Sequence, residues 1–492
     1  MVKEFMRVGI VIVSALGCVQ AFANTYTVKA GGGGDFTTIY ECAKMAKPGD
    51  TCSVYAGSYI GWTHENSGTP GAPITFRAQP GEVASITSSI YVTNTQYVTF
   101  EGFRFSDRAI VGRNPPGLTT RAIVFRNNIV KWAAKNSRAP SIDLYGDELL
   151  IEGNDVSGSG SDFAILGGKN VVVRGNRLHD VDGSESNEHI DFVQVLGQGL
   201  IGGTEPTLRF SLIENNVMQT CLNDGGNCHF VLIRSGVGPI ADNNIVRYNY
   251  AQNLDGSAIA FGGSQDDLVP NASAYNNTMA SMNMTQEEAG WCGTVNYLLP
   301  TNGIFRNNIC YNVQRAGFSP FNFIGPGANN GNLVYTNGFS GIWAAPYANE
   351  PTYAQLANQN PRFIDFPATG ELQASSPAIH AGVPLTVVDP NDVGSGTTLT
   401  VADARYFQPG WAGTQGDWIR VGGAAQAQII SIDYASREIT LASPIRRVSG
   451  DPVHLYKDST GRVVFVGSAP DIGAFPFRAK SRPTAPTHLR VN

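Results

Sequence analysis

Short apolar strands that end in asparagine recur along the middle of this chain. Copies such as Leu150-Ile-Glu-Gly-Asn154 and Val173-Arg-Gly-Asn176 follow one another at roughly 22 to 40 residues, a period at which one supersecondary unit stacks on the next. The asparagines that close such strands are Asn128, Asn154, Asn176, Asn216, Asn249, Asn277 and Asn308. In a stack of this kind each coil buries its apolar face only against its neighbours. The pattern therefore predicts a solenoid.

A second set of apolar strands lies between the asparagine-closed ones. They are Ser141–Tyr145, Asp162–Leu166, Asp191–Val195, His229–Ile233 and Ser257–Phe261, and each is followed within a few residues by a glycine, where the chain turns without a Cβ clash. Because these strands are too short for independent sheets, hydrogen bonds between stacked coils have to complete them. The predicted fold class is all-β, a right-handed parallel β-helix. Its register aligns Asp162, Asp191, His229 and Ser257 in one row.

The repeated asparagine has a structural explanation. Its side chain satisfies backbone groups in a tight turn and tolerates left-handed dihedral angles, and stacked copies bond to one another along the axis. We therefore expect the asparagines to form a ladder and to carry no chemistry. His179-Asp180, which follows one ladder turn, is interpreted in the same way, as a pair that satisfies a turn.

Composition limits the partners of the protein. Of the 492 residues 15% are charged, and the net charge is -6 at pH 7, so no broad cationic surface is available to neutralise a phosphate backbone. We expect no nucleic-acid partner. The 56 glycines and 24 phenylalanines are typical of turn-rich, well-packed β structure and not of a disordered chain.

Residues 1–23 have the pattern of a secretory signal peptide. Lys3 and Arg7 precede an apolar run, and Ala21-Phe-Ala23 supplies a small-x-small cleavage site. The apolar run is too short to span a bilayer. We therefore expect a secreted protein, extracellular or periplasmic, with no membrane contact after the signal is removed. A lipoprotein signal through Cys18 is the alternative.

Six of the seven cysteines follow this segment, and an even number in an exported chain favours disulfides. Pairing of neighbours would join Cys42 to Cys52, Cys221 to Cys228 and Cys292 to Cys310. Six cysteines allow many connectivities, and the sequence does not choose among them. A metal site is the rival interpretation, although the chain contains no C-x-x-C pair.

Several N-terminal segments resemble the opening of known secreted β-helix proteins. These segments are Tyr26–Gly31, Thr37–Asp50, Val54–Tyr59 and Ala72–Phe76. They look like the start of proteins related to polysaccharide lyases of the ninth and sixth families, the pectate lyases and the alginate and chondroitin lyases. The resemblance implies that Thr38–Ala46 is a short helix that caps the open end of the solenoid, where an uncovered strand edge would pair with another chain. It indicates the superfamily and not the substrate.

Near the other end, Ser375–Gly382 and Pro470–Phe475 resemble the paired closing motifs of the same proteins. About 87 residues separate them here, and five short strands with turn residues between them predict an inserted, small, barrel-like β-domain. Its aromatic residues Trp411, Trp418 and Tyr434 fit a sugar-binding module, and a purely structural insert is the alternative. The predicted organisation is a signal peptide at 1–23, a β-helix with its N-terminal cap at 24–386, the insert at 387–466, a closing β-helix segment at 467–479 and an irregular tail at 480–492.

The catalytic lysine of the ninth family is not carried over. There it lies in a Gly-Phe-Lys-Leu-Gly-Gly segment, and the matching Asp162-Phe-Ala-Ile-Leu-Gly-Gly168 has Ala164 or Ile165 at the position of the base. Lys169 follows outside the motif. The tight cluster of calcium-binding aspartates that precedes this segment in the family is missing as well. Lyase chemistry in this chain would need other groups.

The densest polar stretch is His179–Asp191, an acidic loop that enters one of the aligned strands. Stacked coils place equivalent residues roughly 4.8 Å apart, so the aligned row could line a groove with Arg234 at the end of the following strand. The candidate catalytic residues are His189, Asp191, His229 and Arg234, and the candidate substrate-binding residues are Asp162, Gln194 and Lys169. The candidate calcium ligands are Asp180, Asp182, Glu185 and Glu188. A solvated loop, with Gln194 bonded inside the core, is the alternative.

Elimination at a uronic acid needs a positive group that neutralises the carboxylate and a base that removes the C5 proton. Calcium held by the acidic loop would serve the first need and His189 or His229 the second, with Arg234 steering the carboxylate. We therefore expect a secreted enzyme that acts on an acidic, uronate-containing polysaccharide, with lyase chemistry favoured. A C5-epimerase or a glycoside hydrolase on the same scaffold is one alternative. A non-catalytic carbohydrate-binding or structural surface protein is the other.

Overall fold

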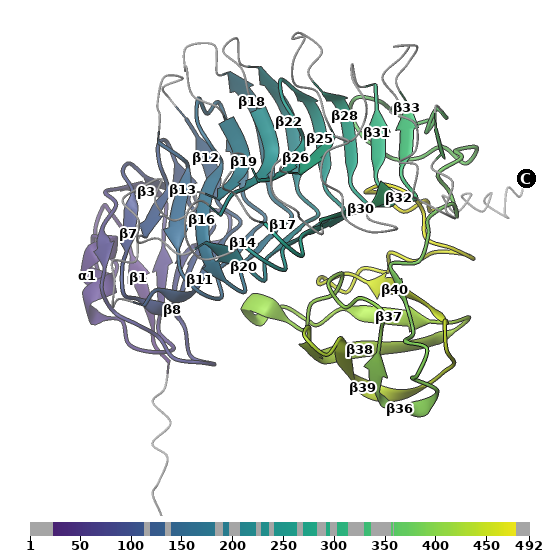
Figure 1. Cartoon of the computed structure of the whole chain (residues 1–492). Helices are drawn as coiled ribbons and strands as arrows, with labels where there is room; N and C mark the ends of the chain where they lie inside the picture. The colour runs from purple at the N-terminus through teal and green to yellow at the C-terminus, as the bar shows by residue number, and fades with distance from the viewer. Residues whose placement is uncertain are drawn as a thin grey trace, which may run out of the picture.

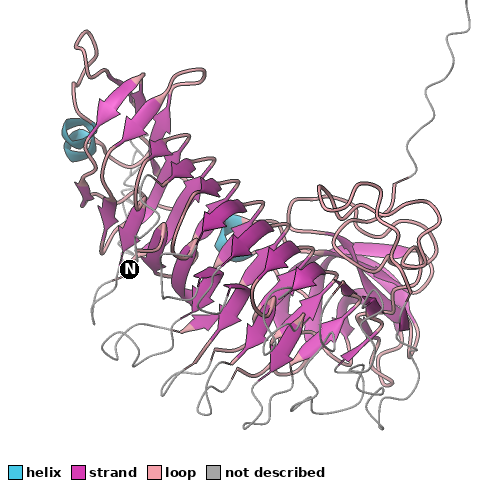
Figure 2. Cartoon of the chain, turned by 90° about the horizontal axis from the view of Figure 1, so that it is seen from above, coloured by secondary structure: helices cyan, strands magenta, loops and turns pink. Residues whose placement is uncertain are grey.

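The chain folds as a right-handed parallel β-helix, as the repeat predicts (Figure 1). The computed structural model describes residues 23–112, 119–132, 139–182, 190–195, 207–222, 228–235, 241–262, 269–282, 292–295, 303–312, 329–335, 356–357 and 359–478. Within these ranges three all-parallel sheets run along the solenoid, here named sheets A, B and C. Each coil passes through them in that order, and Figure 2 shows the strands of successive coils side by side.

The strands of each sheet are short. Sheet A consists of β1 (Thr25–Val28), β2 (Thr51–Val54), β5 (Ile74–Ala78), β8 (Gln96–Glu101), β11 (Arg121–Arg126), β14 (Leu150–Glu152), β17 (Val172–Arg174), β21 (Leu212–Glu214), β24 (Ile245–Arg247), β27 (Ser273–Tyr275), β30 (Ile304–Arg306) and β32 (Asn329–Asn330). Sheet B consists of β3 (Gly57–Tyr59), β6 (Ala84–Ile86), β9 (Arg104–Phe105), β12 (Ile129–Lys131), β15 (Asp155–Ser157), β18 (Arg177–Asp182), β22 (Val217–Leu222), β25 (Tyr250–Leu254), β28 (Thr278–Met282), β31 (Ile309–Tyr311), β33 (Leu333–Tyr335) and β34 (Leu356–Ala357). Sheet C consists of β4 (Thr63–His64), β7 (Ile90–Val92), β10 (Ile110–Gly112), β13 (Ile142–Tyr145), β16 (Ala164–Lys169), β19 (Ile190–Val195), β23 (Cys228–Ile233), β26 (Ile259–Phe261) and β29 (Gly293–Val295), with β20 (Leu208–Arg209) paired to the end of β16.

The expected asparagine ladder lies at the turn from sheet A to sheet B. Nδ2 of Asn154 donates to Oδ1 of Asn176 at 2.9 Å, and Nδ2 of Asn176 donates to Oδ1 of Asn216 at 3.0 Å. The second N–H of each amide goes to a backbone carbonyl of the preceding coil, as from Asn154 to Phe125. The ladder continues without a break through Asn249, Asn277, Asn308 and Asn332. These side chains are buried and fully used in the scaffold, which leaves them no role in chemistry.

Aromatic side chains also stack from coil to coil inside the solenoid. The rings of Phe163 and Phe192 are 4.6 Å apart, and those of Phe192 and Phe230 are 4.9 Å apart. All three side chains are buried in the main core. Stacking of identical residues at the coil spacing fixes the register of β16, β19 and β23, the strands that carry the candidate site.

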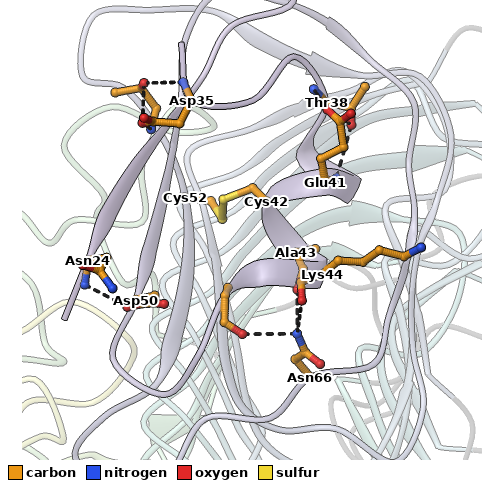
Figure 3. The surroundings of a disulfide bond; sticks show 12 residues. Asn24, Asp35, Thr38, Glu41, Cys42, Ala43, Lys44, Asp50, Cys52 and Asn66 are labelled. Carbon is orange, nitrogen blue, oxygen red and sulfur yellow. Dashed lines mark hydrogen bonds between the residues drawn. A yellow bond between two sulfur atoms is a disulfide. The ribbon is translucent and has the colours of Figure 1, made fainter. Parts of the chain in front are cut away.

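A short helix caps the N-terminal end of the solenoid, as the resemblance implies (Figure 3). Helix α1 (Ile39–Met45) begins with a capping box in which Thr38 and Glu41 bond to each other's backbone amides. The disulfide between Cys42 and Cys52 ties the helix to β2. Nδ2 of Asn66 donates to the carbonyl of Ala43 at 2.8 Å, so the last turn of the helix is held as well.

The C-terminal part contains an antiparallel sheet, which lies beside the solenoid in Figure 1. Its strands are β35 (Thr386–Val387), β40 (Pro452–Lys457), β37 (Trp418–Val421), β38 (Ala425–Asp433), β39 (Glu438–Arg447) and β36 (Gly394–Thr400), in this spatial order, and the 3-10 helix η1 (Trp411–Gly413) precedes β37. A bridge between Val388 and Val401 joins the two ends of the order. The sheet therefore closes into a small barrel. The boundaries of the insert at 387 and 466 stay a prediction.

The barrel covers part of the outer face of sheet A. Leu212 and Ile245 of sheet A belong to the same buried cluster as Ile419 and Leu455 of the barrel. Within this interface Arg247 is completely buried; it forms a two-pronged ion pair with Asp417, at 2.7 Å for each bond, and a second ion pair with Glu214 at 2.8 Å. Sheet A is thus unavailable to a ligand where the barrel packs on it.

The interface also accounts for two of the aromatic residues that fitted a sugar-binding module. The rings of Trp411 and Tyr434 lie 6.2 Å and 5.4 Å from that of Phe210, which precedes β21. The hydroxyl of Tyr434 donates to the carbonyl of Phe407 at 2.7 Å. Trp411 and Tyr434 therefore pack the barrel onto the solenoid. Trp418 lies instead beneath the ammonium group of Lys457, 4.3 Å from it.

The three disulfides join neighbours in the sequence, Cys42 to Cys52, Cys221 to Cys228 and Cys292 to Cys310. Neighbour pairing was one of the connectivities that the sequence left open, and it is the one observed. Disulfides of this number are typical of proteins that mature in an oxidising compartment. No helix in the described ranges is long and apolar enough to cross a membrane. The expected signal peptide falls outside the described residues, apart from Ala23.

Candidate functional site

Asp162, Asp191 and His229 lie in one row at the start of three neighbouring strands of sheet C. Asp191 of β19 and His229 of β23 are register partners. The carboxylate of Asp162, just before β16, accepts a hydrogen bond from the backbone N of Asp191 at 2.7 Å. Oδ1 of Asp191 in turn accepts one from the backbone N of His229 at 3.3 Å. The alignment expected from the repeat is observed, and each carboxylate holds the backbone of the next coil.

The side chains of Asp191 and His229 form a carboxylate–imidazole pair. Nδ1 of His229 lies 2.9 Å from Oδ1 of Asp191. The Asp191 side chain is fully buried, whereas 15% of the His229 side chain is exposed. A carboxylate on Nδ1 orients the ring and favours the tautomer in which Nε2 is the basic nitrogen. The His229 ring is thus oriented by Asp191 and partly exposed at the surface of the solenoid.

The other candidates on these strands lie further along them. Gln194 is 3% exposed and lies between Ile165 and Leu232 in the register. Arg234 is half-buried just after β23. The rise of a strand places its Cα up to ~16 Å from that of His229, so the two side chains would contact different parts of an extended ligand.

Lys169 is not brought to the row. It is exposed at the far end of β16, where its register partner is Arg209 of β20. Its Nζ lies 5.4 Å from the centre of the Phe210 ring, a cation–π distance. Seven residues of strand separate it from Asp162, up to ~23 Å. Its assignment to substrate binding stays a prediction for a distant subsite.

The acidic loop is only partly described. His189, Glu185 and Glu188 lie outside the described residues, and so does the side chain of Asp182. Asp180 is 78% exposed, and Nδ1 of His179 lies 2.7 Å from its carboxylate. Within the described ranges no group of three or more His, Cys, Asp or Glu side chains is arranged to hold a metal ion. Calcium binding by this loop remains a prediction, and no chemical step is derived through it.

The structure also pairs a histidine that the sequence assigned to a turn. Nε2 of His179, on β18, lies 2.9 Å from Oδ1 of Asp155 on β15, and its Nδ1 faces Asp180. Both ring nitrogens are thus occupied by carboxylates, and the side chain faces out from sheet B with 18% exposure. The sequence signal that could have found this pairing is the register of the asparagine-closed strands. It places Asp155 one coil before Arg177, two residues from His179. This arrangement supports a structural role for His179.

Comparison with known proteins identifies likeness only to solved structures. No protein-family model matches the sequence, and no curated protein matches it. A lacto-N-biosidase from Eubacterium ramulus is 15% identical, with 63% of this chain and 64% of that chain covered and a TM-score of 0.37. A mannuronic acid specific family 6 polysaccharide lyase from human gut microbiota is 14% identical over 63% of this chain and 67% of its own, with a TM-score of 0.37.

A rhamnogalacturonan lyase is 11% identical over 63% of this chain and 87% of its own, with a TM-score of 0.36. For the lacto-N-biosidase, the region that this chain matches is 64% of that protein's length. Likeness at this level assigns no activity to the chain. The parallel β-helix itself is established by the strand pairing within the molecule.

Proposed function

We propose that this protein is an exported enzyme that acts on an acidic, uronate-containing polysaccharide by β-elimination. The observation that carries the proposal is the pair formed by Asp191 and His229, with Nδ1 of the imidazole 2.9 Å from the carboxylate and the ring partly exposed. A partly exposed imidazole oriented by a buried carboxylate is a suitable general base. The solenoid presents it on a long face that matches an extended polymer.

In the proposed reaction Nε2 of His229 removes the proton from C5 of a uronate unit. The electron pair of the C5–H bond forms the C4–C5 double bond, the bond from C4 to the glycosidic oxygen breaks, and the leaving oxygen takes up a proton from solvent water. Asp191 stabilises the imidazolium that forms, because its carboxylate already accepts from Nδ1. The products are an unsaturated uronate at one new end and a free hydroxyl group at the other.

The polymer also has to be held and its reacting carboxylate neutralised. We assign the holding to Arg234, whose guanidinium group would bind the carboxylate of an adjoining uronate unit. The positive group at the reacting carboxylate is expected from the loop that contains His189 and the predicted calcium ligands. C5 epimerisation would use the same base but return a proton to the sugar without breaking the glycosidic bond.

The test is turnover of pectate, alginate and chondroitin sulfate, followed by the ultraviolet absorbance of unsaturated uronates and by new reducing ends. His229→Ala and Asp191→Asn are expected to lower the rate by about 100-fold or more, the usual contribution of a general base. His179→Ala is the matched control, because it removes a histidine bonded to carboxylates on sheet B. New reducing ends without absorbance would indicate a hydrolase. If neither signal appears with any of the three polymers, the proposal of β-elimination is wrong.

A further inference from the structure

A cavity of about 820 Å³ lies between the N-terminal cap and the first coil of the solenoid. It is lined by the start of α1 and by the corner that joins β3 to β4, including Tyr40, Ile60 and Trp62. Its volume is in the range of small-molecule sites in proteins. The apolar side chains at this cavity are unusually accessible, because Ile60 is 78% exposed and Tyr40 is 46% exposed.

The chemistry of the lining fits a sugar unit. Exposed apolar surface from Ile60 and Tyr40 is combined with the hydroxyl groups of Ser58 and Thr63 and the carboxylate of Glu65. A sugar ring has the complementary surface, with an apolar C–H face and a rim of hydroxyl groups. Among the described residues that line the cavity, Glu65 alone carries a charge at neutral pH. The lining itself therefore offers a uronate contacts to its hydroxyl groups, and the ammonium group of Lys44, 4.4 Å from the centre of the Tyr40 ring, is a cation close to the cavity.

Trp62 is an independent sign that a ligand belongs at this cavity. Its side chain is 4% exposed and packs on Phe76, with ring centres 5.2 Å apart. Its indole N–H is buried and has no hydrogen-bond partner among the described residues. A buried donor without an acceptor costs free energy, and such groups in native proteins call for an explanation. The N–H is closed off in the absence of a ligand, so we infer a small movement of the ring that opens it to a hydroxyl oxygen of a bound sugar as acceptor.

The cavity lies in line with the Asp191–His229 pair. Strand β4 is the end strand of sheet C, and β19 and β23 are the fifth and sixth strands beyond it in the sheet order. The register of sheet C can be extended backwards from Thr63, the first paired residue of β4. Three residues before it, Ile60 falls on the row of Asp162, Asp191 and His229. At roughly 4.8 Å per strand, the cavity is about 24 to 29 Å from the pair along the solenoid axis.

We infer that this cavity is a distal subsite that holds one sugar unit of the polysaccharide whose chain runs along sheet C to His229. The inference rests on the proposed function for the identity of the ligand, but the subsite itself requires only binding. A polymer long enough to reach both places gains affinity from the second contact, because the two contacts are linked in one molecule. A trisaccharide is too short to reach both and gains nothing.

The test measures binding of polygalacturonate and of alginate, each as polymer and as trisaccharide, by calorimetry in the full-length His229→Ala protein. Ile60→Ser removes exposed apolar surface, and Trp62→Phe removes the indole donor with little change of shape. Each substitution is expected to weaken binding of one of the polymers by about threefold to tenfold, the value of one hydrogen bond or apolar contact. Ile430→Ser, at an isoleucine of the barrel that is 55% exposed, is the matched control and should leave affinity unchanged.

The outcomes separate the subsite from the proposed reaction. Weaker polymer binding by Ile60→Ser supports the subsite. If the wild-type protein also releases no unsaturated product, the lyase is contradicted while the subsite stands. Equal polymer affinity in Ile60→Ser, Trp62→Phe and Ile430→Ser overturns the subsite whether or not the lyase activity is found. Since Ile60 is on the surface, its variant decides the question even if Trp62→Phe folds poorly. A wild-type protein that binds neither polymer overturns the inference as well.

Discussion

Substitution of one asparagine in the middle of the ladder should destabilise the whole solenoid. The side chain of Asn216 accepts hydrogen bonds from N and Nδ2 of Asn176 at 2.9 and 3.0 Å. It donates to the carbonyl of Val173 at 2.9 Å and to Oδ1 of Asn249 at 3.0 Å. Asn216→Ala removes all four bonds and leaves two buried donors of Asn176 without an acceptor.

The size of the effect follows from those two donors. Each buried donor left unsatisfied costs about 1–3 kcal/mol, so Asn216→Ala should lower the free energy of unfolding by about 2–6 kcal/mol. Folded domains typically have a free energy of unfolding of about 5–15 kcal/mol, so this loss is a large share of the total. Asn216→Asp keeps the acceptor for Asn176 but buries a carboxylate beside Oδ1 of Asn249. Its damage should therefore shrink at acidic pH, where the carboxyl group is protonated and regains a donor.

The assay is urea unfolding followed by circular dichroism of the strands, with the midpoint compared between variants. Asn391→Ala is the control, because Asn391 is exposed and outside the ladder; its effect should stay within about 0.5 kcal/mol. An Asn216→Ala midpoint equal to that of the control would show that the ladder contributes no net stability. Equal damage by Asn216→Asp at neutral and acidic pH would refute the role assigned to its hydrogen bonds.

Three further substitutions test other parts of the structure. Arg247→Met leaves the buried carboxylates of Glu214 and Asp417 without their cation. Calorimetry should show that the free energy of unfolding falls by about 3–5 kcal/mol. A fall below about 1 kcal/mol, the value for exposed ion pairs, would contradict the burial. Burial lowers the pKa of His64 from the usual 6.5 to about 4. The folded protein therefore binds fewer protons than the unfolded chain between these values, and stability should fall as pH drops from about 6.5 to about 4; melting curves of His64→Phe should show a smaller fall, and an unchanged fall would contradict this assignment. Gly168→Ala would place a Cβ 1.9 Å from the carbonyl oxygen of Gly146, so thermal unfolding should occur several degrees lower, and wild-type stability would show that the two coils are further apart.

The sequence by itself determined the solenoid and the register of its coils. Asparagines such as Asn154 and Asn176, and the apolar strands that start at Asp162, Asp191 and His229, predict contacts between adjacent coils. Such contacts are repeated at each coil, so a linear pattern is enough to derive them. The sequence also indicated disulfides from the even number of cysteines, but the connectivity of near neighbours was decided by the structure.

Only the tertiary structure decided which surfaces are available and which side chains meet across long separations. Arg247 and Asp417 are 170 residues apart in the chain, and no repeat relates them, so the packing of the barrel on sheet A was beyond sequence reasoning. The same holds for the cavity at Tyr40, Ile60 and Trp62, which depends on how the cap helix lies against the first coil. The periodic contacts are local and are encoded in spacing, whereas these depend on the complementary shapes of surfaces that meet only after folding.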